Sequence, residues 1–140
     1  MNDFLAIERV VFDYCWFADM QDIDALVSLF DQDGIMDASE FGLPVIKGRQ
    51  SLRDFFQTLL ETHKCSQHLA GNFRVDIAKN EASGTSYYVM EGLLKDSSPI
   101  SAKGYYKDRF VRTTEGWKIL RRKGIPLLPV NSYTVKMDSE

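Results

Sequence analysis

The stretch NFRVDIAKNEASGTSYYVMEGLL, residues 72–94, decides the fold class because its hydrophobic residues repeat with a period of two. Apolar residues alternate with polar ones in its first part; they are Phe73, Val75 and Ile77. Alternation of this kind is typical of a β-strand with one buried face. Residues 79–82 predict a turn, and residues 84–95 predict a second strand. The stretch therefore predicts two antiparallel strands joined by a tight connection.

The rest of the chain extends this pattern in both directions. Residues 101–113 and 116–125 predict a closing hairpin around Gly116, which completes a four-stranded antiparallel meander. Toward the N-terminus the period becomes helical, over residues 3–20, over a short segment capped by Asp24, and over residues 49–63, with a short strand expected at 35–41. Helices followed by strands predict an α+β fold, in which three N-terminal helices pack on a curved, mainly antiparallel sheet. Such a sheet, closed by helices, forms a cone with an interior pocket.

Composition limits the classes of protein to which the chain can belong. Its 140 residues predict a single domain spanning 1–140. With 17 basic and 20 acidic residues the net charge is −3, which argues against nucleic acid as a partner. No apolar stretch is long enough for a membrane helix, and the N-terminus lacks a signal-peptide pattern. Cys15 and Cys65 are expected to be reduced packing residues in a cytoplasmic protein.

His68 and Asp19 are the first candidates for chemistry. Gly71 predicts a β-bulge, which would shift the strand's phase and turn His68 inward. Asp19 ends a helix, where a carboxylate opposes the helix dipole, and such a local conflict points to function. Taken separately, each has an ordinary explanation as an exposed strand histidine or a solvated helix-end acid. Together they would form a general base, because the carboxylate orients the imidazole and stabilises its charged form.

Five further residues are weaker candidates for the site. Tyr14 lies on the apolar helix face and could donate a hydrogen bond to a substrate oxygen, although a core tyrosine is equally expected. Glu91 stands among apolar neighbours, so it needs a partner. Arg122 could pair with Glu91 or with a substrate anion, or could be a solvated edge arginine. Tyr106 and Asp108 share a strand face and are further substrate-binding candidates.

Motifs for cofactors are missing from the sequence. There is no glycine-rich phosphate loop, no GxSxG element, and no metal-ligand spacing around the two histidines. We therefore expect no cofactor and no metal.

The order of elements resembles the SnoaL-like branch of the NTF2-like superfamily. VVFDYCWFADMQDIDALVSLFDQDGIMD is similar to its opening helix pair, IKGRQSLRDFF to its third helix, HLAGNFRVDI to its histidine-bearing strand, and GYYKDRFVRTTEGWKILRR to its closing hairpin. Within the superfamily the chain resembles most the group of scytalone dehydratase, lindane dehydrochlorinase and the bile-acid dehydratases. Those enzymes use an Asp–His dyad, which would fall on Asp19 and His68. Their tyrosine would fall on Tyr14, their later acid on Glu91 and their last-strand arginine on Arg122.

The resemblance implies a cofactor-independent lyase, dehydratase-like, or an isomerase or polyketide cyclase-like enzyme, acting on a hydrophobic small molecule. His68 would remove a proton, Asp19 would support it, and Tyr14 would donate a hydrogen bond. The alternative is a non-catalytic module for ligand binding or assembly, such as a dioxygenase small-subunit-like protein. A homodimer or higher homo-oligomer is expected, paired through an outer sheet face that carries Tyr88 and Met90.

Overall fold

The structure is a computed structural model that describes residues 2–132, with side chains described up to Pro129. Its helices are α1 (Asp3–Asp19), α2 (Ile23–Ser28), the short 3₁₀ helix η1 (Ser39–Phe41) and α3 (Arg49–Glu61). Its strands are β1 (Phe30–Asp37), β2 (Val45–Lys47), β3 (His63–Ala78), β4 (Glu81–Leu94), β5 (Pro99–Thr113) and β6 (Gly116–Ser132). The sequence did not predict β2, and β1 begins five residues before the predicted strand. Within residues 2–132 no helix has the length and apolar character needed to cross a membrane.

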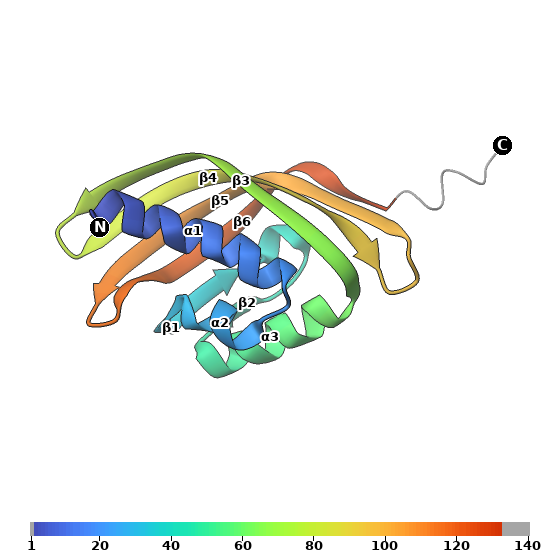
Figure 1. The fold of residues 1–140 in the computed structure, drawn as a ribbon, viewed down its shortest axis with the longest axis horizontal. Helices are drawn as coiled ribbons and strands as arrows, with labels where there is room; N and C mark the ends of the chain where they lie inside the picture. The colour runs from blue at the N-terminus through green and yellow to red at the C-terminus, as the bar shows by residue number, and fades with distance from the viewer. Residues whose placement is uncertain (1, 133–140) are drawn as a thin grey trace.

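The six strands form one sheet in the order β2-β1-β6-β5-β4-β3. Neighbouring strands are antiparallel except for β1 and β6, which run parallel. In Figure 1 the long strands β3 to β6 arch over α1, while α2 and α3 lie below the arch. The predicted α+β cone is confirmed: helices cover the concave face of a curved, mainly antiparallel sheet.

Contacts at both ends of α1 fix it beneath the sheet. Asn2 caps its first turn by accepting the Leu5 backbone N–H at 2.8 Å. The Asp3 carboxylate accepts from the Arg112 guanidinium at 2.8 and 2.7 Å and from the Trp117 indole N–H at 3.1 Å. These bonds, chiefly the one from Arg112, lower the pKa of Asp3 to about 2. The first turn is thus tied to the closing hairpin, and the last turn carries Asp19 to the other end of the sheet.

The second helix is capped differently from the prediction. Asp22, rather than Asp24, is the N-cap of α2, and its side chain accepts the Ala25 N–H at 3.2 Å. Asp24 lies inside the first turn, where a negative charge still favours the helix dipole.

A bulge in β3 sets which of its side chains face the interior. The pairing of β3 with β4 shifts between Gly71 and Arg74, and Asn72 adopts a positive φ of 48° there. Before the shift, His68 and Ala70 are partly buried, whereas after it Phe73 and Val75 are. The predicted bulge near Gly71 is therefore confirmed, and it changes the parity of the inward-facing residues from even to odd.

Candidate active site

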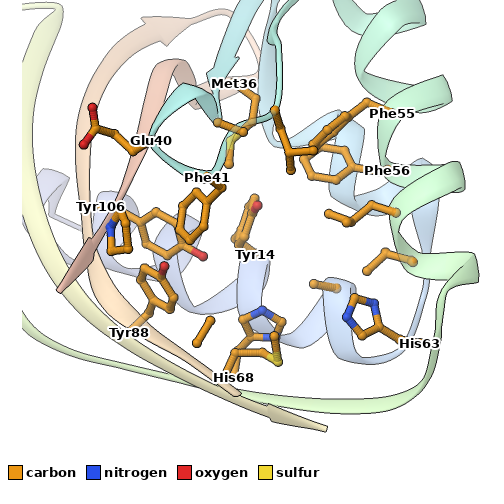
Figure 2. Close-up of a pocket in the computed structure, with 18 of the residues that line it drawn as sticks. Tyr14, Met36, Glu40, Phe41, Phe55, Phe56, His63, His68, Tyr88 and Tyr106 are labelled. Carbon is orange, nitrogen blue, oxygen red and sulfur yellow. The ribbon is translucent and has the colours of Figure 1, made fainter. Parts of the chain in front are cut away.

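A cavity of about 570 Å³ lies between α1, α3 and the concave face of the sheet. Its wall is largely apolar and aromatic, with Tyr14, Phe41, Phe55, Phe56, Tyr88 and Tyr106 contributing rings. The ionisable side chains His63, His68 and Glu40 also reach it. Figure 2 shows the tyrosine rings and both imidazoles facing one shared space. A volume of this size in an apolar wall suits a small organic molecule with few polar groups.

Asp19 at the end of α1 meets His68 on β3. Its Oδ1 lies 2.6 Å from His68 Nδ1, and its Oδ2 accepts the His68 backbone N–H at 2.8 Å. The Ser66 hydroxyl also donates to Oδ1, at 3.0 Å. The Asp19 and His68 side chains are 11% and 14% exposed. The pair is therefore shielded from bulk water and held by three bonds to one carboxylate.

This geometry defines the protonation pattern of the neutral imidazole. An ionised carboxylate can only accept hydrogen bonds, so His68 Nδ1 carries the ring proton. The lone pair then resides on Nε2. Because His68 belongs to the cavity wall, as Figure 2 shows, its ring can take a proton from a molecule bound there.

Three tyrosine rings supply neutral phenols to the cavity. Burial raises the pKa of Tyr14 to about 12, although the nearby Arg122 charge acts in the opposite direction. Burial likewise raises the pKa of Tyr88 to about 12 and the pKa of Tyr106 well above its usual value. All three phenols remain protonated near neutral pH, so each can donate a hydrogen bond.

Arg122 and Asp108 form a sealed ion pair behind these rings. The Arg122 guanidinium donates two hydrogen bonds to the Asp108 carboxylate, both of 2.8 Å, and the two side chains are 0% and 1% exposed. The guanidinium carbon lies 4.3 Å from the centroid of Tyr14 and 3.8 Å from that of Tyr106. Burial alone would lower the pKa of Arg122, but the Asp108 charge raises it above its usual value. The guanidinium of this pair thus packs against both tyrosine rings.

Comparison with known proteins places this architecture in a family. The sequence signature of the SnoaL-like domain matches residues 1–123. The chain belongs to the SnoaL-like family. The "Uncharacterized protein Rv2910c" of Mycobacterium tuberculosis is 30% identical over 128 residues, which cover 87% of this chain and 84% of that protein.

Two solved structures from Novosphingobium aromaticivorans share the fold of this SnoaL-like domain. A "putative aromatic ring hydroxylase" is 30% identical with a TM-score of 0.89, covering 93% of this chain and 92% of its own. A "Putative Scytalone Dehydratase" is 25% identical with a TM-score of 0.82, covering 93% and 87%. The hexachlorocyclohexane dehydrochlorinase LinA-type3 of Novosphingobium barchaimii is 17% identical with a TM-score of 0.82, covering 93% and 89%, which shows a shared fold.

The SnoaL-like domain brings some of the predicted site residues together and separates others. Tyr14, His68 and Tyr106 line the cavity, and Asp19 lies directly behind His68. Arg122 and Asp108 do not line it, because they are bonded to each other beneath the tyrosine rings. The structure therefore gives these two residues no place on the cavity wall, and the suggestion that Arg122 pairs with Glu91 is wrong.

The faces of β4 are the reverse of those predicted. Glu91 is exposed on the outer face, whereas Tyr88 and Met90 are buried and line the cavity. Glu91 therefore lies on the face of β4 that points away from the cavity, and the prediction of an oligomer face made of Tyr88 and Met90 is wrong. The error arose because the outer face is itself apolar, with Tyr87 52% exposed. Alternation alone shows that a strand has two faces and does not show which one is inside.

Tyr88 and His63 are among the cavity residues that were not predicted from the sequence. Tyr88 could have been found from the small and apolar residues at its inward neighbours, Ser86 and Met90. His63 follows α3 directly, and its inward direction depends on a second register shift, between His63 and Cys65. No glycine or other turn residue marks that shift in the sequence, so no signal was available for His63.

Among the residues that the structure describes, no three His, Cys, Asp or Glu side chains are grouped so as to hold a metal ion. Cys15 and Cys65 are both free thiols, the first buried and the second exposed. Burial raises the pKa of Cys15 to about 11, so this thiol stays protonated and is a poor nucleophile.

Proposed function

We propose that this SnoaL-like protein is a cofactor-independent lyase that eliminates water from an apolar, ring-containing small molecule. The observation that carries the proposal is the 2.6 Å contact between Asp19 and His68, made where His68 faces an apolar cavity. A base in such a cavity acts on a substrate that has lost its water shell, which strengthens every charge interaction there.

The reaction follows from the protonation states. His68 Nε2 takes a proton from a carbon next to a carbonyl, and the electrons of the broken C–H bond move into an enolate. Asp19 stabilises the imidazolium, and a neutral phenol such as Tyr14 donates a hydrogen bond to the enolate oxygen. The enolate then expels hydroxide from the neighbouring carbon, forming a C=C bond. Hydroxide takes the proton back from His68 and leaves as water, which regenerates the base.

The same first step also supports isomerisation or cyclisation. An enolate that is reprotonated at another carbon gives an isomer, and one that attacks a second carbonyl gives a ring. The names of two neighbours favour elimination, because a scytalone dehydratase loses water and a hexachlorocyclohexane dehydrochlorinase loses hydrogen chloride. We therefore place dehydration first.

A double-mutant cycle on dehydration of a panel of cyclic β-hydroxy ketones tests the proposal. Ultraviolet absorbance of the conjugated product reports the rate. Asp19→Asn should lower the rate by about 10²- to 10⁴-fold, by analogy with other histidine–carboxylate bases. His68→Gln should cost at least as much, and the double variant scarcely more, because an orienting acid contributes nothing once the base is gone.

A matched control keeps the cycle interpretable. Gln67 is exposed and adjacent to His68, so Gln67→Ala changes the strand without touching the cavity and should keep full activity. Additive losses for Asp19→Asn and His68→Gln would show that the two residues do not act as one unit. Unchanged turnover in either variant would remove that residue from the mechanism.

A second candidate is a non-catalytic binding or assembly module of a ring-hydroxylating system. The 30% identity to a neighbour named as an aromatic ring hydroxylase favours it. Such a module binds apolar ligands in the cavity without converting any of them, and Asp19→Asn leaves that binding intact. Stable co-purification with a catalytic subunit, with no turnover of the ketone panel, would support this candidate over the lyase.

We also propose that the protein forms a homodimer or higher homo-oligomer through the outer sheet face. The registers of β3 to β6 place Leu69 beside Val89, and Tyr87 beside Tyr105. Leu69 and Tyr87 are 63% and 52% exposed, so this outer face leaves apolar surface in water. Sedimentation equilibrium at micromolar concentration should show an oligomer, and Tyr87→Lys should weaken it. A monomer would refute the proposal.

A further inference from the structure

His63 is a second imidazole in the cavity, and its direction depends on a local irregularity. In a regular strand, the side chains of residues five apart point to opposite faces of the sheet. A regular β3 would therefore turn only one of His63 and His68 toward the cavity. The register of β3 against β4 shifts between His63 and Cys65, which inserts one extra residue at this point. Both histidines consequently line the cavity, and Figure 2 shows both rings facing it. Bulges that redirect a side chain in this way are frequent beside binding sites.

The turn that follows α1 holds both histidines in place. Asp19 binds His68 through its carboxylate, and two residues later the Gln21 side-chain amide donates to the His63 carbonyl oxygen at 3.2 Å. Gln21 itself has a positive φ of 56°, an uncommon conformation for a residue with a side chain. One turn of backbone therefore positions the two imidazoles relative to each other.

The His63 ring is buried without full hydrogen bonding. Only 7% of the residue is exposed, and Nδ1 has no hydrogen-bond partner among the described residues. Burial lowers the pKa of His63, an effect that the Leu59 backbone carbonyl partly offsets by hydrogen bonding, so the ring is neutral near pH 7. A buried polar atom without a partner costs free energy, which a bound group can recover.

The chemistry of a neutral imidazole defines the group that suits it. The ring has one N–H and one lone pair, and a backbone carbonyl such as that of Leu59 can pair only with the N–H. The other ring nitrogen is then an acceptor. The matching group on a ligand is a hydrogen-bond donor, and in an otherwise apolar cavity this is a hydroxyl on a hydrocarbon frame.

We propose that His63 is a specificity-determining residue that binds a hydroxyl group of the substrate, in addition to the group that reacts at His68. The inference rests on the proposed function and narrows its substrate class to hydroxylated, ring-containing molecules with a polar group at the α3 end of the cavity. His63 selects the ligand and orients it, while the proton transfer remains with His68.

The presence of only two histidines in the chain allows a direct test. In the His68→Gln variant, ¹⁵N-histidine labelling leaves a single imidazole, that of His63. Naphthalene and 2-naphthol are the probes, because they differ by one hydroxyl group. We expect 2-naphthol to shift the His63 ring ¹⁵N signals and naphthalene to leave them nearly unchanged. We also expect 2-naphthol to bind about fivefold more tightly, the ratio that one net hydrogen bond provides.

The second arm compares this variant with His63→Leu/His68→Gln. The preference for 2-naphthol should fall to within about twofold, while naphthalene binding stays the same because the apolar wall is kept. His63→Gln/His68→Gln retains a polar side chain and should keep part of the preference, which protects the test if the leucine variant folds poorly. Near-ultraviolet circular dichroism checks the packing of each variant.

The outcomes separate this inference from the proposed function. If both probes bind, but the His63 signals stay fixed under 2-naphthol and the preference survives His63→Leu, the role of His63 is overturned and the Asp19–His68 lyase is untouched. If neither probe binds any variant, the cavity is not a site for apolar ligands, and the two proposals fail together. Loss of ketone turnover in His68→Gln belongs to the lyase proposal alone.

Discussion

Two of the pairs that aspartates form with basic side chains, Asp108–Arg122 and Asp19–His68, differ in what surrounds them. Asp108 and Arg122 are 1% and 0% exposed, and the Arg122 guanidinium donates two hydrogen bonds to the Asp108 carboxylate while it packs against the rings of Tyr14 and Tyr106. Asp19 and His68 retain 11% and 14% exposure at the cavity wall. The sealed pair, Asp108–Arg122, does not line the cavity and serves the structure, whereas the open pair, Asp19–His68, can exchange a proton with a molecule bound in the cavity.

The tyrosines connect the two pairs. Tyr14 and Tyr106 contact the Arg122 guanidinium with their ring faces and also line the cavity. A change in the sealed pair should therefore shift these two rings of the cavity wall, even though neither Arg122 nor Asp108 lines the cavity.

Breaking the sealed pair should give the largest loss of stability. Asp108→Ala leaves the Arg122 charge buried and unpaired, which costs about 3–5 kcal/mol of unfolding free energy. Asp19→Ala leaves unpaired hydrogen-bond donors on Ser66 and His68 rather than an unpaired buried arginine charge, so its cost should be smaller, about 1–3 kcal/mol. Urea denaturation followed by circular dichroism measures both, and Asp76→Ala on the exposed part of β3 serves as a control. Equal losses at Asp108 and Asp19 would contradict the distinction between the pairs.

The buried tyrosines of the cavity wall, Tyr14 among them, should make the free energy of unfolding fall at high pH. The folded-state pKa of Tyr14 is about 12, above the ordinary value of 10.0, so the folded state binds this proton more tightly than the unfolded state. The resulting stabilisation is complete below pH 10 and is lost as pH rises from 10 to 12. Two pKa units correspond to about 2–3 kcal/mol.

Denaturation at pH 9, 10 and 11 measures this loss. Tyr14→Phe should make the decline shallower by the Tyr14 contribution, because a phenylalanine has no proton to lose, while the part due to Tyr88 and Tyr106 remains. Tyr87→Phe is the matched control, since Tyr87 is 52% exposed on the outer face and should leave the decline unchanged. An unaltered decline in Tyr14→Phe would mean that Tyr14 is not the group responsible.

Asp19→Asn tests the open pair, Asp19–His68, and we expect it to change the unfolding free energy by less than the alanine variants of Asp108 and Asp19 do. Because a carboxylate at the C-terminal end of a helix opposes the helix dipole, that effect alone would make removal of the charge neutral or stabilising. The structure instead shows donors from Ser66 and from both the ring and the backbone of His68 on this carboxylate, so we expect a loss of about 1–2 kcal/mol. Thermal melts measure the loss, and Ser66→Ala, which removes one of the three donors, should cost less. A stabilised Asp19→Asn variant would show that the dipole effect dominates.

Local patterns predicted the architecture well and the site in part. The period-two segments, the helical spacing and the bulge near Gly71 each depend on nearby residues, and all appear in the structure. The pairing of β1 with β6 and the short β2 depend on contacts between distant segments, which no local pattern encodes. The meeting of Asp19 with His68, 49 residues apart, was suggested only by family resemblance. The inward direction of His63 depends on a register shift that no turn residue marks in the sequence. The burial of Arg122 depends on its pairing with Asp108, which the sequence alone does not show.

Glu91 provides a third acid, remote from both pairs, where the expected effect is smallest. It lies on β4 next to Met90, but the strand's alternation places Met90 in the cavity and Glu91 on the exposed outer face. Glu91→Gln removes one charge while keeping the side chain's length, and a solvated surface charge contributes little to stability. We expect the unfolding free energy to change by less than about 0.5 kcal/mol and ketone turnover to stay within about twofold.

Met90→Gln is the matched comparison, since it puts the same residue one position away on the inner face. It introduces a polar amide into the apolar cavity wall and should lower both stability, by about 1–3 kcal/mol, and the binding of naphthalene. The two variants together measure which face of β4 is inside. A tenfold loss of turnover in Glu91→Gln with Met90→Gln unaffected would mean that the strand presents the opposite face to the substrate, and that the acid on it is part of the site after all.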